Sequence, residues 1–189
     1  MRIFISGGCK NGKSYYAQHL AKVQKQESLY YVATMKSVDS EDDERIERHR
    51  RERDGWGFTT IEQAVDIEKI LDKPGHDGSF LLDSVTALLA NEMFLPGGDI
   101  NENAAEKIIN GLSQVINAVS DIVIVSDYIY SDACIYDMFT ENYRKSLAEI
   151  DCALAKCCDV VLEVAYANVI VHKGGELCGN FGENYEAIL

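Results

Sequence analysis

Residues 7–14 form a motif that could bind phosphate, since they read Gly-Gly-Cys-Lys-Asn-Gly-Lys-Ser and complete the pattern G-x-x-x-x-G-K-[ST]. The glycines let the backbone curl so that successive N–H groups face one anion. In such a loop Lys13 reaches the β- and γ-phosphates of a nucleotide, and the Ser14 hydroxyl binds Mg²⁺. We therefore predict a catalytic role for Lys13 and a metal-binding role for Ser14, in a nucleotide site made of Gly7, Gly8, Cys9, Lys10, Asn11, Gly12, Lys13 and Ser14.

The segments on either side of this loop have the patterns that would position it. Residues 2–6 form a short apolar run suited to a buried strand, and residues 14–25 carry Tyr16, Leu20 and Val23 at helical spacing. Strand, glycine loop and helix start are the context that the motif requires. The N-terminus of that helix would add the positive end of its dipole to the anion site.

Further along the chain, continuous apolar runs alternate with helix-like segments. This alternation predicts a mostly parallel sheet covered on both faces, a three-layer α/β/α arrangement of the P-loop NTPase (RecA-like) class. We expect one nucleotide-binding domain over residues 1–173 and a Gly-rich, acidic tail of doubtful order over 174–189. The expected strands are 2–6, 29–33, 79–83, 122–126, 160–164 and an edge strand at 168–171; the expected helices are 14–25, 41–54, 64–72, 84–94, 102–119 and 134–157.

An acidic residue at the end of a neighbouring buried strand usually helps to position Mg²⁺ at such a loop. Asp83 follows Phe-Leu-Leu, and Asp127 follows Ile-Val-Ile-Val-Ser. Either carboxylate could instead cap the next helix. We favour Asp83 as the metal-positioning residue because a helix-like segment begins directly after it.

A basic segment surrounds His49. Five of the chain's 18 Lys and Arg residues lie between positions 45 and 53. One interpretation is a solvated helix with i, i+4 ion pairs. The other is an anion site beside a nucleophile, because arginines bind phosphates bidentately and their field would keep His49 neutral. Histidine can form a covalent intermediate that splits one transfer into two steps. Composition cannot decide between the two.

The overall composition excludes several classes of protein. The net charge of −13 argues against a general nucleic-acid binder, which would present a basic surface. We find no run long enough to span a membrane and no signal peptide, so we expect a cytoplasmic protein. The six cysteines form no C-x-x-C pair, and we expect them to be reduced thiols.

The order of these motifs resembles the bifunctional adenosylcobinamide kinase/adenosylcobinamide-phosphate guanylyltransferase family of cobalamin biosynthesis. The resemblance runs to about residue 173 and is densest over 3–90. After the phosphate loop come Tyr-[Val/Ile]-Ala-Thr, Arg-Ile-x-x-His, an element like Trp-x-Thr-x-Glu, and Leu-Leu-[Glu/Asp] with a later Thr. Their counterparts here are Tyr31-Val32-Ala33-Thr34, Arg45-Ile46-Glu47-Arg48-His49, Phe58-Thr59-Thr60-Ile61-Glu62, and Leu82-Asp83 with Thr86.

The resemblance implies two linked reactions. His49 would take GMP from GTP as a guanylyl-histidine, and the phosphate loop would use ATP or GTP to phosphorylate a corrinoid hydroxyl. It also implies Mg²⁺ as cofactor, no nucleic-acid partner, and a small homo-oligomer, typically a trimer. The family's nucleotide contacts fall on Ala33, Thr34, Met35, Arg50, Arg51, Glu52, Arg53, Glu62 and Asp83.

The second half of the chain departs from the family pattern. Asp127-Tyr128-Ile129-Tyr130 stands where family members commonly carry Asn-Glu-Val-Gly. Two other hypotheses therefore stay open. One is a P-loop small-molecule kinase with a changed acceptor or without guanylyl transfer. The other is a nucleotide-binding regulatory or assembly protein without catalysis.

Overall fold

The computed structural model describes residues 1–24, 28–73, 77–130, 132–166 and 168–178. In this part of the chain the centre is a seven-stranded sheet in the order β3-β2-β4-β5-β1-β6-β7. Neighbouring strands from β3 to β6 run parallel, and β7 pairs with β6 in the antiparallel direction. The strands are β1 Arg2–Gly7, β2 Leu29–Ala33, β3 Thr59–Glu62, β4 Ser79–Asp83, β5 Asp121–Asp127, β6 Val160–Ala165 and β7 Asn168–Lys173.

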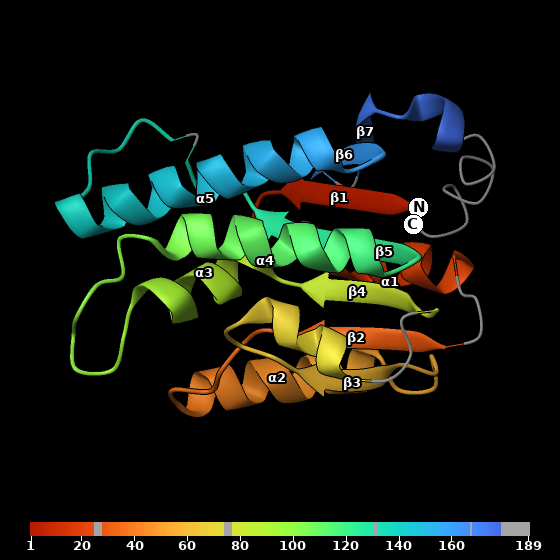
Figure 1. Cartoon of the computed structure of the whole chain (residues 1–189), viewed down its shortest axis with the longest axis horizontal. Coiled ribbons are helices and arrows are strands. Elements are labelled where there is room, and N and C mark those ends of the chain that lie inside the picture. The colour runs from red at the N-terminus through yellow and green to blue at the C-terminus, as the bar shows by residue number, and fades with distance from the viewer. Residues whose placement is uncertain (25–27, 74–76, 131, 167, 179–189) are drawn as a thin grey trace.

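Helices cover both faces of this sheet (Figure 1). One face packs against α3, α4, α5 and the 3-10 helix η1, and the other packs against α1. Helix α2 lies beside the β3 edge (Figure 1). The bounds are α1 Lys13–Val23, α2 Ser40–Glu52, η1 Ile67–Asp72, α3 Val85–Met93, α4 Ala104–Ala118 and α5 Met138–Cys157, followed by a second 3-10 helix η2 at Gly175–Cys178.

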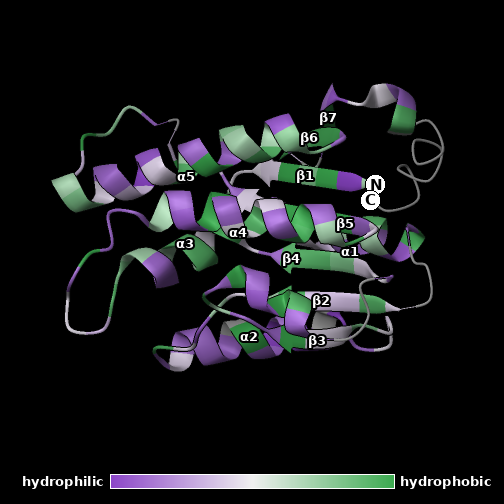
Figure 2. Cartoon of the chain, in the orientation of Figure 1, coloured by the Kyte–Doolittle hydropathy of each residue, from purple (hydrophilic) through white to green (hydrophobic). Residues whose placement is uncertain are grey.

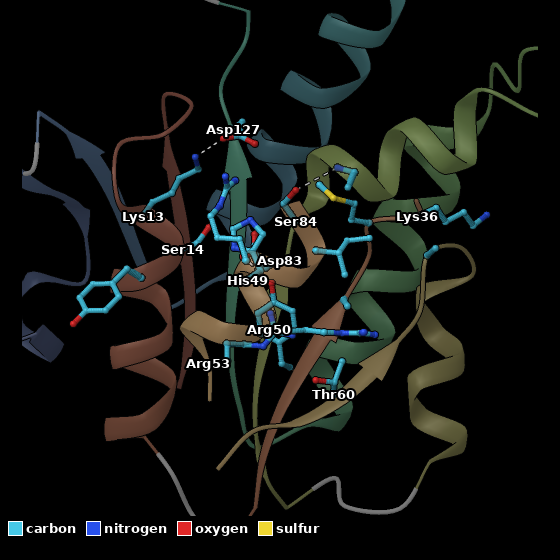
Figure 3. A pocket seen from close by; sticks show the side chains of 18 of the residues that line it. Lys13, Ser14, Lys36, His49, Arg50, Arg53, Thr60, Asp83, Ser84 and Asp127 are labelled. Atoms are coloured by element: carbon cyan, nitrogen blue, oxygen red, sulfur yellow. Dashed lines mark hydrogen bonds and ion pairs between the residues drawn. The ribbon is translucent and has the colours of Figure 1, made fainter. Parts of the chain in front are cut away.

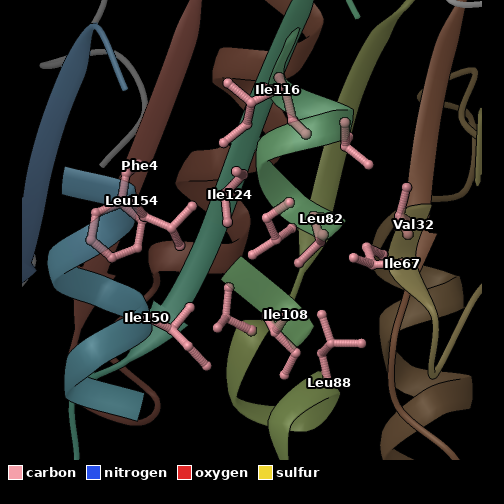
Figure 4. Packing of buried hydrophobic residues seen from close by; sticks show 14 of the residues in the cluster. Phe4, Val32, Ile67, Leu82, Leu88, Ile108, Ile116, Ile124, Ile150 and Leu154 are labelled. Atoms are coloured by element: carbon pink, nitrogen blue, oxygen red, sulfur yellow. The ribbon is translucent and has the colours of Figure 1, made fainter. Parts of the chain in front are cut away.

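The two layers of core explain why the central strands are apolar throughout. Phe4, Leu82 and Ile124 point to one face and pack with Ile108 and Ile150 from the helices above (Figure 4). Because strands β4 and β5 are also covered on the other face, nearly every residue in them is buried. Figure 2 shows the contrast with α2, whose residues are mostly hydrophilic. The predicted three-layer α/β/α fold is confirmed.

The structure differs from the sequence prediction in three places. Strand β3 was not predicted, because only one of its four residues is buried and it has no apolar run. The helix expected at 64–72 is a 3-10 helix that begins at Ile67. Helix α5 begins at Met138 rather than 134, because the Asp137 carboxylate caps it by accepting hydrogen bonds from two backbone N–H groups. Of the expected tail, residues 179–189 lie outside the described residues.

Two further observations concern membrane-spanning helices and the cysteine side chains. Across the described ranges, no helix has both the length and the apolar character needed to cross a membrane. The described cysteine side chains are free thiols, at Cys9, Cys134, Cys152, Cys157 and Cys158.

Candidate active site

The parallel sheet brings the carboxyl ends of five strands to one edge. In the register of the sheet Gly7 lies opposite Asp127, at the ends of β1 and β5. Ala33, at the end of β2, lies between Glu62 of β3 and Asp83 of β4. Residues far apart in the sequence therefore meet where the phosphate loop leaves β1, as expected for an open α/β sheet.

The phosphate loop is shaped by glycine and by the Asn11 side chain. Gly12 has a φ of 89°, in the left-handed region that favours glycine, and its carbonyl accepts the first hydrogen bond of α1 from Tyr16 N at 3.1 Å. Asn11 accepts a hydrogen bond from Lys13 N at 3.2 Å and donates one to the carbonyl of Val164. This asparagine ties the loop to β6.

Position 7 requires glycine because neighbouring atoms approach its backbone closely. A Cβ at this position would lie 2.5 Å from Asn11 Nδ2 and 2.5 Å from the Val164 carbonyl oxygen, which is inside any normal contact distance. At Gly8 a Cβ would meet no atom within 4 Å. The two adjacent glycines therefore have different roles. The first makes room for the loop's anchor, and the carbonyl of the second accepts a 3.0 Å hydrogen bond from Lys13 Nζ.

Lys13 is held by a carboxylate from the neighbouring strand. Its side chain is nearly buried, and its ammonium forms an ion pair with Asp127 (Figure 3). The backbone of Asp127 is fixed in turn, because its N–H donates to Thr86 Oγ1 at 2.9 Å. Asp127 thus lies where an incoming phosphate would approach the lysine.

Asp83 does not cap the helix that follows it. That cap is Ser84, whose hydroxyl accepts a hydrogen bond from Ala87 N at 3.3 Å. The Asp83 carboxylate instead accepts a 3.0 Å hydrogen bond from the Tyr31 hydroxyl and faces the cavity. Asp83 is therefore free to act on a ligand.

Helix α2 presents two different sides. Its exposed side carries Arg51, which forms an i, i+4 ion pair with Glu47 at 3.3 Å. His49 and Arg50 line the cavity, and Arg50 Nη2 lies 3.1 Å from Glu62 Oε1. The ion pair supports the solvated-helix interpretation for the exposed side, whereas the anion site beside a nucleophile stays a prediction for the side that lines the cavity. Its last turn carries the positive residues that suit the negative end of a helix dipole.

Arg53, the C-cap of α2, behaves unlike the other arginines. Only 8% of its surface is exposed, and its guanidinium carbon lies 3.6 Å from the centre of the Tyr31 ring. Tyr31 therefore contacts both the basic segment and Asp83. Arginine stacks well on an aromatic face because its guanidinium is planar and weakly hydrated.

These elements enclose a cavity of about 1020 Å³, at the upper end of ligand-pocket volumes, roughly 300–1,000 Å³. Figure 3 shows Lys13, Ser14, His49, Arg50 and Asp83 around it. The predicted site residues that line it are Cys9, Lys10, Asn11, Gly12, Lys13, Ser14, Ala33, Met35, His49, Arg50, Arg53, Glu62 and Asp83.

Some predicted site residues are not brought to this cavity. Gly7, Gly8 and Arg51 do not line it, and the side chain of Glu52 lies outside what the structure describes. Thr34 is fully buried and has a structural contact, since its hydroxyl donates to the Ser84 carbonyl at 2.8 Å and accepts from Ser84 N at 2.7 Å.

Tyr31 and Asp127 are among the residues of the cavity wall that were not chosen from the sequence. Tyr31 reads as core in an apolar strand, and nothing local signals that its hydroxyl reaches Asp83. Asp127 was weighed as an alternative to Asp83. The signal that could have favoured it is strand order, because β5 is hydrogen-bonded to the phosphate-loop strand and β4 is not.

The oxygen donors here suit Mg²⁺ when a nucleotide shares the coordination. Ser14, Asp83 and Asp127 all line the cavity, and Mg²⁺ usually takes one or two carboxylates together with substrate phosphates. Within the described ranges no group of three or more His, Cys, Asp or Glu side chains could hold a metal unaided.

A second carboxylate is buried behind Asp127. Asp151 of α5 is 4% exposed, and its Oδ2 accepts a 2.9 Å hydrogen bond from the Tyr130 hydroxyl. Burial raises the pKa of Asp151 to about 6, although the hydrogen bond from Tyr130 opposes the shift. Burial likewise raises the pKa of Tyr130.

The fold of this chain is similar to that of a solved protein structure. The structure is similar to that of the flagellar accessory protein FlaH from Methanocaldococcus jannaschii, with a TM-score of 0.50, 14% identity, and coverage of 90% of this chain and 77% of that one. At this identity the likeness concerns the fold alone, and the fold is that of an α/β P-loop NTPase.

Two relatives share more of the sequence. The bifunctional adenosylcobalamin biosynthesis protein CobU of Escherichia coli strain K12 is 32% identical over 120 residues, which are 62% of this chain and 63% of that protein. The match thus spans less than two thirds of the Escherichia coli relative. The protein of the same name from Salmonella typhimurium strain LT2 is 24% identical over 172 residues, 85% of this chain and 93% of that protein.

The family comparison covers most of the chain. A model of the cobinamide kinase / cobinamide phosphate guanyltransferase family matches residues 3–169, a range that includes the phosphate loop, all of α2 and the strand-end carboxylates. The chain belongs to the cobinamide kinase / cobinamide phosphate guanyltransferase family.

Proposed function

We propose that the protein phosphorylates adenosylcobinamide with ATP or GTP and then transfers GMP from GTP to adenosylcobinamide phosphate, giving adenosyl-GDP-cobinamide. Membership of the family supports this proposal, as do the names of the two relatives. The observation that carries it is that the phosphate loop and His49 line one cavity. A phosphoryl-transfer loop and a nucleophile can there act on the same nucleotide.

In the kinase reaction the phosphate loop would hold the donor nucleotide. Lys13 would leave Asp127 and contact the β- and γ-phosphates, and the backbone N–H groups of the loop would surround them. Ser14 and Asp83 would hold Mg²⁺, which neutralises charge on the phosphates when bound. Asp83 is suited to this because the Tyr31 hydroxyl fixes one of its oxygens and leaves the other available.

In the guanylyl transfer His49 would act as nucleophile and carry GMP covalently. Arg50 and Arg53, which line the cavity with it, would supply positive charge to the triphosphate. Ala33, Met35 and Glu62, which line the cavity, complete the proposed nucleotide contacts. The positions Thr34, Arg51 and Glu52 are implied by the family resemblance alone.

Other parts of the proposal rest on the family resemblance. The acceptor is a corrinoid small molecule, the protein acts in the cytoplasm without a nucleic-acid partner, and it assembles as a homo-oligomer, a trimer by analogy. The cavity is large enough for a nucleotide with space beside it. Analytical ultracentrifugation of the purified chain tests the assembly directly.

The decisive experiment is guanylylation with labelled GTP. We expect a protein adduct that is labile in acid and stable in base, as for a phosphorus–nitrogen bond to histidine. The change His49→Ala should abolish the adduct while ATP still binds at the phosphate loop. A wild-type protein that binds nucleotide but gives no adduct refutes the guanylyl-transfer half.

One structural feature favours a second candidate, a small-molecule kinase with a changed acceptor. Tyr130 occupies a position where the family pattern has glycine, and its hydroxyl is tied to buried Asp151 at 2.9 Å. The segment that follows Asp127 thereby differs from the family pattern. This candidate predicts phosphoryl transfer that survives His49→Ala, with no turnover of adenosylcobinamide.

A further inference from the structure

Three aromatic rings form a cluster beside the phosphate loop. Tyr15 lies in the first turn of α1, directly after Ser14. Its ring makes T-shaped contacts with His19, at 4.6 Å between ring centres, and with Trp56, at 5.8 Å. His19 and Trp56 also contact each other, at 4.5 Å. The three rings therefore hold one another in place, and they join the start of α1 to the segment that follows α2.

Tyr15 is the exposed member of this cluster. Its exposed fraction is 47%, and it lines the cavity, whereas His19 and Trp56 are more covered. Burial, together with the charge of Lys22, lowers the pKa of His19, so the ring that supports Tyr15 is uncharged at neutral pH. The tyrosine thus presents a supported aromatic surface to the cavity.

The other tyrosine of the cavity wall has its ring occupied. Among the residues that the structure describes, the tyrosines that line the cavity are Tyr15 and Tyr31. Tyr31 is only 4% exposed, and the guanidinium carbon of Arg53 lies 3.6 Å from the centre of its ring. A planar ligand in this cavity would therefore find the ring of Tyr15 available and the ring of Tyr31 covered.

The position of Tyr15 on α1 suits the nucleoside end of a bound nucleotide. Lys13 and Ser14, which precede it, lie on the phosphate-loop side of the cavity (Figure 3). They would contact the β- and γ-phosphates and the metal ion. The first turn of a helix faces such phosphates with its N–H groups, so the next side chain of that turn lies close to the nucleoside that the α-phosphate carries.

We propose that Tyr15 stacks on the base of the nucleotide that the phosphate loop binds, and that His19 and Trp56 position its ring. This inference rests on the proposed function, and it adds a base-binding surface to the phosphate contacts. Every base has a π-face, so stacking accepts adenine and guanine alike when no hydrogen bond reads the edge of the base. Tyr15 then allows the kinase reaction to use either ATP or GTP.

A ligand without a base separates stacking from phosphate binding. Calorimetry in the presence of Mg²⁺ gives the affinities of ATP, GTP and inorganic tripolyphosphate for the wild type and for Tyr15→Leu, which keeps an apolar side chain but removes the ring. We expect the variant to weaken ATP and GTP at least about fivefold more than tripolyphosphate, as for loss of one base–aromatic stack. Tyr15→Phe keeps the ring and should bind all three ligands within about twofold of the wild type.

The matched control is Phe139→Leu. Phe139 lies in the first turn of α5, is 52% exposed and does not line the cavity, so its loss should change no affinity by more than about twofold. Circular dichroism shows whether each variant is folded. If Tyr15→Leu is unfolded, Tyr15→Met replaces it under the same criterion, because methionine favours helix and has no ring.

Three results overturn the proposal. The first is a difference below about fivefold between nucleotide and tripolyphosphate in a folded variant, since a disturbed phosphate loop weakens both ligands alike. The second is a loss confined to ATP or to GTP, since stacking does not read the edge of the base. The third is an equal loss in Tyr15→Phe.

The assay involves no turnover, so it is independent of the proposed reactions. A wild type that binds both nucleotides through Tyr15 but does not phosphorylate adenosylcobinamide refutes the proposed function, while the stacking surface stands. A wild type that phosphorylates adenosylcobinamide, together with a folded Tyr15→Leu variant that weakens nucleotide and tripolyphosphate equally, refutes the stacking surface alone.

Discussion

Lys13 of the phosphate loop is ion-paired with Asp127, a residue 114 positions away that ends the adjacent strand. The pair holds the lysine inside the cavity with little exposed surface. A carboxylate therefore occupies the approach that a nucleotide phosphate would use. A nucleotide phosphate that binds Lys13 must therefore displace the Asp127 carboxylate, or it must bind together with a metal cation that lets both anions stay near the lysine.

Removing this carboxylate should strengthen the binding of phosphate without metal. In Asp127→Asn we expect ADP in excess EDTA to bind about fivefold more tightly, roughly 1 kcal/mol, because like-charge repulsion is relieved. The unliganded protein should be less stable, since Lys13 loses its partner. Calorimetry and thermal unfolding with and without ADP measure both effects.

The matched variant for this test is Asp83→Asn. Its carboxylate lines the same cavity but is bonded to Tyr31 rather than to Lys13. We expect a smaller change in metal-free ADP affinity and a larger loss of Mg²⁺-dependent turnover. If Asp127→Asn binds ADP more weakly than the wild type, the ion pair does not oppose phosphate.

The two adjacent glycines of the loop should respond differently to alanine. Gly7→Ala puts a methyl group against Asn11 and Val164, so we expect a loss of stability of about 1–3 kcal/mol, seen as a fall in Tm of several degrees. Gly8→Ala, where the same methyl meets open space, should leave Tm nearly unchanged. Equal Tm values for the two variants would contradict the close contact at Gly7.

Asp151 should make stability depend on pH in an unusual direction. Burial raises its pKa from 3.8 to about 6 in the folded protein, so between those values the folded state binds a proton that the unfolded state has released. Stability from this group is then present at low pH and falls as pH rises from about 4 to about 6, by at most about 3 kcal/mol. Asp66, whose ion-pair hydrogen bonds with Lys107 and Lys69 lower its pKa to about 2, acts below this window.

The variant Asp151→Asn isolates the effect. Asparagine can still accept the hydrogen bond from Tyr130 but has no proton to lose, so it should be more stable than the wild type at pH 8 and similar at pH 4. Urea unfolding at several pH values measures the difference. Taking the difference also cancels His19, whose pKa is lowered by burial and whose contribution changes with pH in the opposite direction. A pH-independent difference between the two proteins would refute the buried-proton account.

The phosphate loop could be predicted because its chemistry is local. The motif, the strand before it and the helix after it lie within 25 residues, and the structure places them as expected. The apolar runs also predicted the central strands, because a strand that is buried on both faces is apolar along its whole length. Strand β3 was not predicted, because it lies at the edge of the sheet and three of its four residues are exposed.

The pairings within the site depend on three-dimensional arrangement that the sequence does not carry. Asp127 meets Lys13 only because β5 lies beside β1, whereas Asp83 is one strand further away. The arginines of α2 look alike in sequence, but the geometry of the helix end exposes Arg51 and buries Arg53 against Tyr31. Which arginine faces the cavity could not be read from composition.

Tyr31 provides a last test, because it separates the metal side of the site from the arginine side. The change Tyr31→Phe removes the hydroxyl that donates to Asp83 and keeps the ring that supports Arg53. A hydrogen bond to a charged group contributes about 1.5–3 kcal/mol, so we expect kinase kcat/KM to fall about tenfold and the Mg²⁺ requirement to rise. The neighbouring Tyr30→Phe, whose ring stacks on Phe80 in the core of the opposite face, controls for loss of a hydroxyl. If Tyr31→Phe and Tyr30→Phe have the same Mg²⁺ dependence, the Tyr31 hydroxyl does not orient Asp83 for metal binding.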